Sequence, residues 1–106
     1  MSAQEGGQPT EFQVQVPPDI EPGVYANFLG VWHTPYEFTL DFAVTQPPEP
    51  REEVLTVPCR VVARIKVPVG VIFDVIRTLN DNMTKYEQTF GEIHRPVPPS
   101  EGEALE

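Results

Sequence analysis

Apolar and polar residues alternate along the stretch that follows Pro35. The apolar positions are Tyr36, Phe38, Leu40, Phe42 and Val44, and the positions between them are Glu37, Thr39, Asp41, Ala43 and Thr45. This period of two predicts a half-buried β-strand. The preceding stretch from Val24 to Trp32 is apolar or small except at Asn27. A turn at Thr34-Pro35 would join the two stretches in a β-hairpin.

The hairpin assigns its side chains to two faces, because residues that face each other across two strands lie on the same side of the sheet. We expect one face to be core. It gathers Tyr25, Leu29, Val31, Tyr36, Phe38, Leu40 and Phe42. The other face is mixed, and it carries Val24, Phe28 and Trp32 beside Glu37, Thr39 and Asp41.

Two further strands are indicated. One runs from about Cys59 to Val67, and its polar side carries Arg60, Arg64 and Lys66. Antiparallel to the second strand of the hairpin, these cations would form a charge ladder with Glu37 and Asp41. The other strand covers Glu11–Val16, with Phe12, Val14 and Val16 on one face, and its short length and following prolines are typical of an edge strand.

A long helix is predicted after Pro68, which suits the first turn of a helix. Gly91 fits the position just past its end. Apolar residues form a stripe at spacings of three and four, with extra apolar flanks in the first half that predict burial there on more than one side. The stripe comprises Ile72, Ile76, Leu79, Met83, Tyr86 and Phe90.

These elements predict an α+β fold: a small antiparallel sheet, made of a β-hairpin plus one or two further strands, packed by one long C-terminal helix. One helix about 10 Å wide cannot cover three or four strands spaced about 4.8 Å apart. So small a core is marginal without a disulfide, a metal or an oligomer. The chain has one cysteine, which excludes an internal disulfide. We therefore expect a dimer or a higher oligomer.

Proline and charge define the domain boundaries. The chain has 106 residues and a net charge of −9, and its acidic and proline-rich segments lie outside the predicted elements. We expect a disordered N-terminal tail over 1–10, a single α+β domain over 11–94 with a loop near 46–53, and a disordered acidic tail over 95–106. Such charge opposes non-specific binding to nucleic acid or to an anionic membrane.

The same sequence contains no apolar run of 18 residues and no basic region followed by an apolar stretch, so it predicts neither a membrane span nor a secretory signal. The expected compartment is the cytoplasm.

Catalytic and metal-binding patterns are missing from the sequence. Cys59, His33 and His94 stand far apart, whereas a metal site needs clustered ligands. Cys59 lies on the inward side of its strand, which predicts a small core residue. Glu37 and Asp41 would lie about 13 Å apart on one strand, too far for an acid/base pair. We therefore expect no enzyme, no catalytic residue, no metal and no cofactor.

The mixed outer face of the sheet supplies the candidate binding residues. They are Phe28, Trp32, Val62, Arg60 and Arg64. Buried in an assembly, they would form a subunit or partner interface. Left open, aromatic and basic side chains on a sheet could stack single-stranded bases. Glu37 and Asp41 on the same face, together with the acidic tails, favour the first interpretation.

Several short motifs resemble a family of short bacterial and archaeal proteins that is catalogued as a domain of unknown function. The motifs are Tyr25-Ala26-Asn27-Phe28, Pro35-Tyr36-Glu37-Phe38, Asp41-Phe42, Tyr86-Glu87 and Phe90-Gly91-Glu92-Ile93. The resemblance covers roughly 24–93; it implies a prokaryotic cytosolic protein and supplies no activity. At the level of fold alone, strands followed by a long helix are similar to the subunit plan of SecB, a tetrameric export chaperone.

The sequence thus predicts a non-enzymatic, homo-oligomeric protein-interaction module, acting as a scaffold, a chaperone-like protein or a regulatory subunit. Its partners would be copies of itself and another protein. The alternative is a protein that binds single-stranded nucleic acid through the outer sheet face.

The terminal segments generate a first testable prediction. Residues 1–10 and 95–106 are expected to be dispensable for folding, because their proline and acid content leaves little to bury. A chain of residues 11–94 should keep its midpoint of thermal unfolding within a few degrees, as measured by circular dichroism. Loss of cooperative melting would show that one of the ends is structural.

Overall fold

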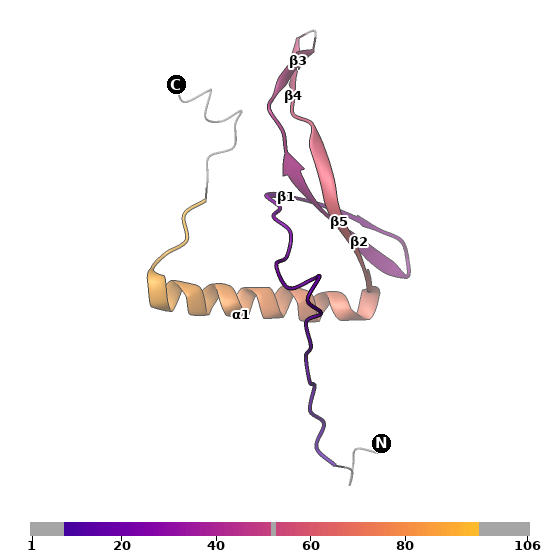
Figure 1. Cartoon of the computed structure of the whole chain (residues 1–106), viewed down its shortest axis with the longest axis vertical. Coiled ribbons are helices and arrows are strands. Elements are labelled where there is room, and N and C mark those ends of the chain that lie inside the picture. The colour runs from indigo at the N-terminus through magenta and orange to yellow at the C-terminus, as the bar shows by residue number, and fades with distance from the viewer. Residues whose placement is uncertain (1–7, 52, 96–106) are drawn as a thin grey trace. The chain divides into compact units, whose positions relative to one another are not determined.

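The computed structural model describes residues 8–51 and 53–95 (Figure 1). The elements in chain order are β1 (Phe28–His33), β2 (Glu37–Thr45), β3 (Glu49–Arg51), β4 (Val54–Thr56), β5 (Cys59–Pro68), the 3-10 turn η1 (Val69–Val71) and α1 (Ile72–Phe90). One sheet has the strand order β1-β2-β5, and β3 and β4 form a second sheet of two strands. The predicted α+β class is confirmed, as are the hairpin, the third strand and the C-terminal helix.

Internal contacts divide the chain into two compact units. The first unit comprises the chain up to Leu29 together with Phe42–Ala63. The second comprises Gly30–Asp41 together with the chain from Arg64 onward. Strands β1, β2 and β5 each contribute residues to both units. The expectation of a single domain over 11–94 stays a prediction.

The turn of the β1–β2 hairpin belongs to the second unit and is built around Thr34. The Thr34 N–H donates to the Glu37 carbonyl at 2.9 Å. Its hydroxyl accepts the N–H groups of Tyr36 and Glu37 at 3.1 and 3.2 Å. A threonine hydroxyl that bonds the backbone two and three residues on is a common way to close a turn. The predicted turn at Thr34-Pro35 is therefore confirmed.

In the first unit, Asn27 holds the start of β1 against the end of β2. The Asn27 N–H donates to the Ala43 carbonyl at 2.9 Å. The side-chain oxygen of Asn27 accepts the Thr45 N–H at 3.0 Å, and its amide nitrogen donates to the Thr45 hydroxyl at 3.2 Å. The single polar residue of an otherwise apolar stretch thus extends the backbone pairing by one side chain.

Strands β3 and β4 form a short ribbon in which Glu49 pairs with Thr56, Pro50 with Leu55 and Arg51 with Val54. Strand β3 falls inside the segment near 46–53 for which a loop is predicted, so that expectation is wrong there. Proline has no N–H to donate, but an unpaired strand side tolerates it, and Pro50 occupies such a position in a ribbon of two strands. At the base of the ribbon, the Gln46 N–H donates to the Pro58 carbonyl at 2.8 Å.

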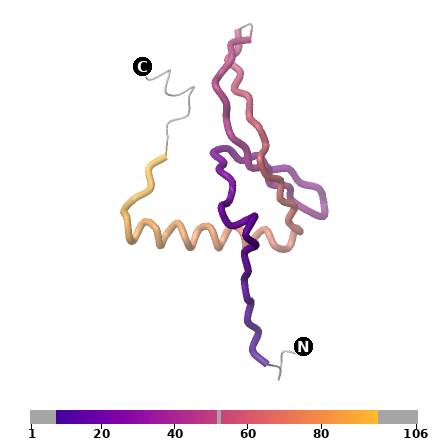
Figure 2. Tube along the Cα trace, in the orientation of Figure 1, coloured from indigo at the N-terminus to yellow at the C-terminus, as the bar shows by residue number. Residues whose placement is uncertain are grey.

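The N-terminal segment carries no strand, which corrects the prediction for Glu11–Val16. Residues 8–16 run as an extended trace (Figure 2) and have no regular hydrogen-bonded structure. The chain then turns at Pro17, whose carbonyl accepts the N–H groups of Ile20 and Glu21 at 2.9 and 3.0 Å. Alternation assigns side chains to two faces, but a strand also needs a neighbouring backbone to pair with. The predicted disordered tails lie outside the described residues, except for 8–10 and Arg95.

Burial along β2 is the reverse of the expected one. The buried residues of this central strand are Thr39, Asp41 and Ala43, on its mixed face. Phe38, Leu40 and Phe42, which were expected to be core, are only half-buried. Among the described residues, Ala43 and Val67 are the only buried hydrophobic side chains. The apolar face of the sheet is therefore incompletely covered within one chain.

Helix α1 matches the predicted stripe but buries none of its residues. Leu79, in the middle of the stripe, is 67% exposed, so the expected burial of this face does not occur within one chain. The helix follows η1, and Pro68 ends β5 instead of opening the helix. No helix in the described ranges combines the length and the apolar character that crossing a membrane requires.

The end of α1 generates a prediction that isolates one backbone conformation. Gly91 follows the helix with φ +101°, and its N–H donates to the Glu87 carbonyl at 2.9 Å. A β-carbon at Gly91 would meet no atom within 4 Å, so Gly91→Ala should destabilise through the backbone alone, by about 1–3 kcal/mol. Chemical denaturation followed by circular dichroism would measure the change.

Gly70→Ala is the matched control for this variant. Gly70 also has open space around a built β-carbon, and its φ is not in the left-handed region. Alanine there should leave the free energy of unfolding unchanged or raise it by about 0.4–1 kcal/mol, because it restricts the unfolded chain. Equal losses in the two variants would contradict the role given to the conformation of Gly91.

Candidate functional site

Asp41 is the centre of a polar cluster that lies within the second unit. Arg64 from β5 donates from Nε to Asp41 Oδ1 at 2.7 Å and from Nη2 to Oδ2 at 2.9 Å. Trp32 from β1 donates from its indole Nε1 to Oδ2 at 3.0 Å. A bidentate guanidinium–carboxylate pair combines charge with fixed geometry. One carboxylate on the central strand therefore ties together residues from both neighbouring strands.

The cluster keeps Asp41 charged. The hydrogen bonds from Arg64 lower the pKa of the Asp41 carboxyl below its ordinary value of 3.8, although burial acts in the opposite direction. The Trp32 hydrogen bond and the nearby charge of Lys66 lower it further. In return, the hydrogen bonds to Asp41 raise the pKa of the Arg64 guanidinium. A carboxylate with only 6% of its residue surface exposed is thus compensated by three donors.

A second ion pair lies on the same strands. Lys66 Nζ donates to Glu37 Oε2 at 3.2 Å and to the Thr39 hydroxyl at 3.3 Å. Together with the Arg64–Asp41 pair, this contact confirms the predicted charge ladder between β2 and β5. The Lys66–Glu37 pair is largely exposed, so it contributes about 0–1 kcal/mol.

The five candidate binding residues fall into the two units. Trp32 and Arg64 lie in the second unit and meet at Asp41. Phe28, Arg60 and Val62 lie in the first unit and are exposed. The Arg60 side chain makes no hydrogen bond or ion pair with another described residue. That all five form one binding surface stays a prediction.

Sequence reasoning identified the charge ladder but omitted Asp41 from the candidate site. The signal was present, because Asp41 is the acidic position of an alternating strand and Arg64 is a basic position of its neighbour. The hydrogen bond from Trp32 was not expected. It follows from the shared face of Trp32 and Asp41, which the hairpin register had assigned.

In the part of the chain that the structure describes, the geometry indicates neither a metal site nor a nucleophile. No three His, Cys, Asp or Glu side chains gather as potential ligands within 8–51 and 53–95. Cys59 is exposed, so its expected place in the core is wrong, and its thiol donates to the Val57 carbonyl at 3.6 Å. The expectation of a buried side chain is wrong because Cys59 is the first residue of β5, at the end of the strand.

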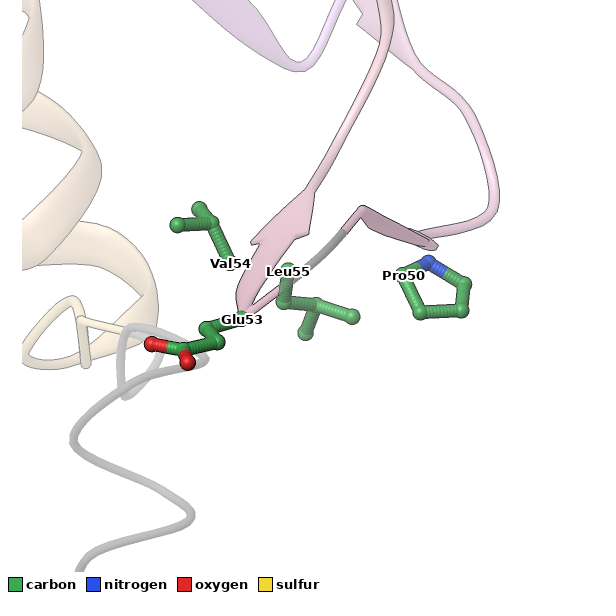
Figure 3. A pocket seen from close by; sticks show the side chains of 4 residues that line it. All are labelled: Pro50, Glu53, Val54 and Leu55. Carbon is green, nitrogen blue, oxygen red and sulfur yellow. The ribbon is translucent and has the colours of Figure 1, made fainter.

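A shallow hollow lies on the β3–β4 ribbon. Its lining consists of Pro50, Glu53, Val54 and Leu55 (Figure 3). All four residues come from one hairpin, and Glu53 supplies the only charged group. A ligand site usually combines an enclosed apolar wall with several convergent polar groups. This hollow has neither, so it gives no indication of a small-molecule ligand.

The apolar stripe of α1 is the second feature with functional potential, and we call it the α1 stripe. It consists of Ile72, Ile76, Leu79, Met83, Tyr86 and Phe90. All of these except Ile72 are exposed. The rings of Tyr86 and Phe90 contact each other with centroids 4.9 Å apart. Continuous apolar surface of this kind marks an interaction site more often than scattered exposed residues do.

The positions that flank the α1 stripe are nearly free of charge. Asn82 donates its side-chain amide to the Thr78 carbonyl at 3.2 Å, and Thr84 donates its hydroxyl to the Asn80 carbonyl at 3.1 Å. Glu87, the one charged neighbour, accepts the Ile93 N–H at 3.0 Å. The helical period places Asp74, Arg77, Asp81 and Lys85 on the far side of the helix. The stripe can therefore approach another apolar surface without burying a free charge.

The Asp41 cluster generates a pH-dependent prediction. Asp41→Asn removes the charge that Arg64 and Trp32 bind, so the variant should melt at a lower temperature than the wild type at pH 7. The pKa of Asp41 is depressed in the folded state, so its stabilisation is complete above the ordinary value of 3.8 and disappears as the pH falls through the lower folded value. The two melting temperatures should therefore converge in acid.

Circular dichroism melts over a pH series would measure this convergence. Asp74→Asn is the matched control, since Asp74 pairs with Arg77 on the helix surface and its side chain is 59% exposed. The control should change the melting temperature little at any pH. A gap between wild type and Asp41→Asn that stays constant down to strong acid would contradict the electrostatic role of Asp41.

One protein family matches most of the chain. The model of a family described as "Protein of unknown function (DUF3467)" matches residues 1–95. No curated protein and no solved structure matches the chain. The expected similarity to the subunit plan of SecB stays a prediction. Because the family match extends over most of its length, the chain belongs to the DUF3467 family of proteins of unknown function.

Proposed function

We propose that this protein is a non-enzymatic, homo-oligomeric protein-interaction module. One observation carries the proposal: among the described residues, the only buried hydrophobic side chains are Ala43 and Val67, whereas the α1 stripe is exposed. A chain of this size depends on burial of nearly all its large apolar residues to offset the entropy lost on folding. Another copy of the chain would supply the missing cover.

The spacing within the α1 stripe supports a second copy as the occupant. Ile76, Met83 and Phe90 recur every seven residues, and so do Ile72, Leu79 and Tyr86. A repeat of 3.5 residues keeps the apolar stripe of one helix facing another helix along its whole length. The two helices then cross at about +20°. An α1 helix of a second chain carries the same repeat, so the two stripes would match each other.

Charge also favours self-association through this stripe. Each chain carries a net charge of −9, so two copies repel each other in general. The flanks of the α1 stripe carry one charged residue, Glu87, so two chains can meet there with little local repulsion. Arg77 and Asp74 form an ion pair at 2.6 Å on the helix and do not compete for the stripe.

A role as a scaffold, a chaperone-like protein or a regulatory subunit is consistent with such a module. Exposed apolar surface left after assembly would bind another protein. We place the protein in the cytoplasm of a prokaryotic cell, with no metal or cofactor required for its activity.

The second candidate is a protein that binds single-stranded nucleic acid through the outer sheet face. It is favoured by Trp32, which is 64% exposed although its indole nitrogen is fixed by Asp41. A fixed, open indole ring is a suitable platform for base stacking. Against it, Arg64 and Lys66 already bind Asp41 and Glu37, so little positive charge is left for phosphates.

Light scattering coupled to size exclusion tests the proposal. We expect a molar mass of at least twice the 11.9 kDa of one chain at micromolar concentration. Leu79→Glu should lower that mass, because it places a charge in the middle of the α1 stripe. Glutamate and leucine have similar helix propensities, so the helix itself should persist.

Gln88→Glu is the matched control, since it adds the same charge on the far side of the helix and should leave the mass unchanged. A wild-type mass of 11.9 kDa would contradict the proposal. Fluorescence anisotropy with a labelled single-stranded oligonucleotide at two salt concentrations tests the second candidate. Tight binding that weakens steeply with salt would favour it, because neutralised phosphates release counterions.

A further inference from the structure

The segment Glu11–Val16 has the pattern of a strand and no partner. Its apolar row, Phe12, Val14 and Val16, alternates with a polar row, Glu11, Gln13 and Gln15. The backbone runs extended (Figure 2) without regular hydrogen bonds, and Phe12 and Val14 are 87% and 83% exposed. An extended, alternating segment with exposed apolar side chains is suited to adding a strand to an open sheet edge.

The three-stranded sheet offers such an edge at β5. In the order β1-β2-β5, strand β5 has a neighbour on one side only. An edge strand presents a row of unpaired N–H and C=O groups. With ten residues it is the longest strand, and its residues 59–67 contain no proline. Its outer edge is therefore long enough to accept the six residues of Glu11–Val16.

The two rows of the segment match the two faces of β5. The polar face of β5 carries Arg60, Arg64 and Lys66, and the last two already bind carboxylates of β2. Arg60 has no partner among the described residues, and Glu11 would supply an opposite charge. On the other face, Val61 and Ile65 are each 48% exposed and would pack with Phe12, Val14 or Val16. A strand whose alternation agrees with both faces fixes its own register.

From this match we infer that Glu11–Val16 of one chain pairs as a fourth strand with the β5 edge of a second copy. The inference rests on the proposed homo-oligomer and names a second contact within it. Within its own chain, the described backbone of the segment finds no strand partner, so the partner is another copy. Exchange of an identical element between protomers is a common route to assembly.

Hydrogen–deuterium exchange on the full chain, read by mass spectrometry, tests the inference. At a concentration where light scattering gives an oligomer, the amides of Glu11–Val16 should exchange more slowly than those of an unstructured peptide. Dilution should remove this protection. Val14→Asp should also remove it, because it places a charge in the apolar row. Gln13→Asp adds the same charge to the polar row and should preserve the protection.

Hydrogen–deuterium exchange in β5 and β1 shows which edge of the sheet the segment pairs with. In Val14→Asp, amides within Cys59–Val67 should lose protection, while those of Phe28–His33 should not change. Because Val14 is exposed in the single chain, this variant should still fold, which its circular dichroism spectrum would check. A change confined to Phe28–His33 would overturn the assignment to β5.

Each combined result has one meaning. Fast exchange of Glu11–Val16 in an oligomer overturns the inference and leaves the proposed function standing. A mass of 11.9 kDa with fast exchange overturns both. A mass of 11.9 kDa with protection that is independent of concentration means that the segment pairs within its own chain, which also overturns the inference.

Discussion

The pairing of β1, β2 and β5 in the second unit depends on the hydrogen bonds that the Asp41 carboxylate accepts. It lies on the central strand β2 and receives hydrogen bonds from Trp32 on β1 and from Arg64 on β5. A buried carboxylate without partners would be costly, so its three donors must be present whenever the strands are paired. The cluster therefore stabilises one register of the three strands relative to the others. A sheet with so little buried hydrocarbon gains its specificity from this polar contact.

The Asp41 cluster also explains why the mixed face of β2, and not its apolar face, is buried within one chain. Long side chains on the neighbouring strands reach across to the carboxylate and cover it. Phe38, Leu40 and Phe42 on the opposite face receive no comparable cover. With the α1 stripe exposed as well, one chain pairs its buried polar groups internally and leaves most of its large apolar side chains uncovered. This uncovered surface is the physical basis of the proposed oligomer.

Sequence patterns predicted the helix and the strands better than they predicted which side chains are buried and which segments pair. The period of two located β2 and β5, and the spacing of three and four located α1 to its last residue, Phe90. Alternation states which residues share a face but not which face one chain covers, so the buried set of β2 was wrong. It also cannot supply a neighbour, so Glu11–Val16 was expected as a strand and is unpaired. The prolines near 46–53 suggested a loop, although two-stranded ribbons accept proline on an unpaired side, as at Pro50. For the candidate site, the ladder was predicted and Trp32 was expected on the same face as Asp41, whereas the hydrogen bond between them depends on side-chain geometry that alternation does not give.

The chain has one tryptophan, and its indole nitrogen is bound to the Asp41 carboxylate at 3.0 Å. Indole emission responds to charge and hydrogen bonding at the ring, so Trp32 is a built-in optical probe of this cluster. Its spectrum reports the protonation of one carboxyl group and the docking of β1 on β2 without any added label. Quenching of its fluorescence by small solutes would report whether Trp32, which is 64% exposed in one chain, becomes covered in an oligomer. The fluorescence of this one side chain therefore reports both the pairing of the strands and any covering of the outer sheet face.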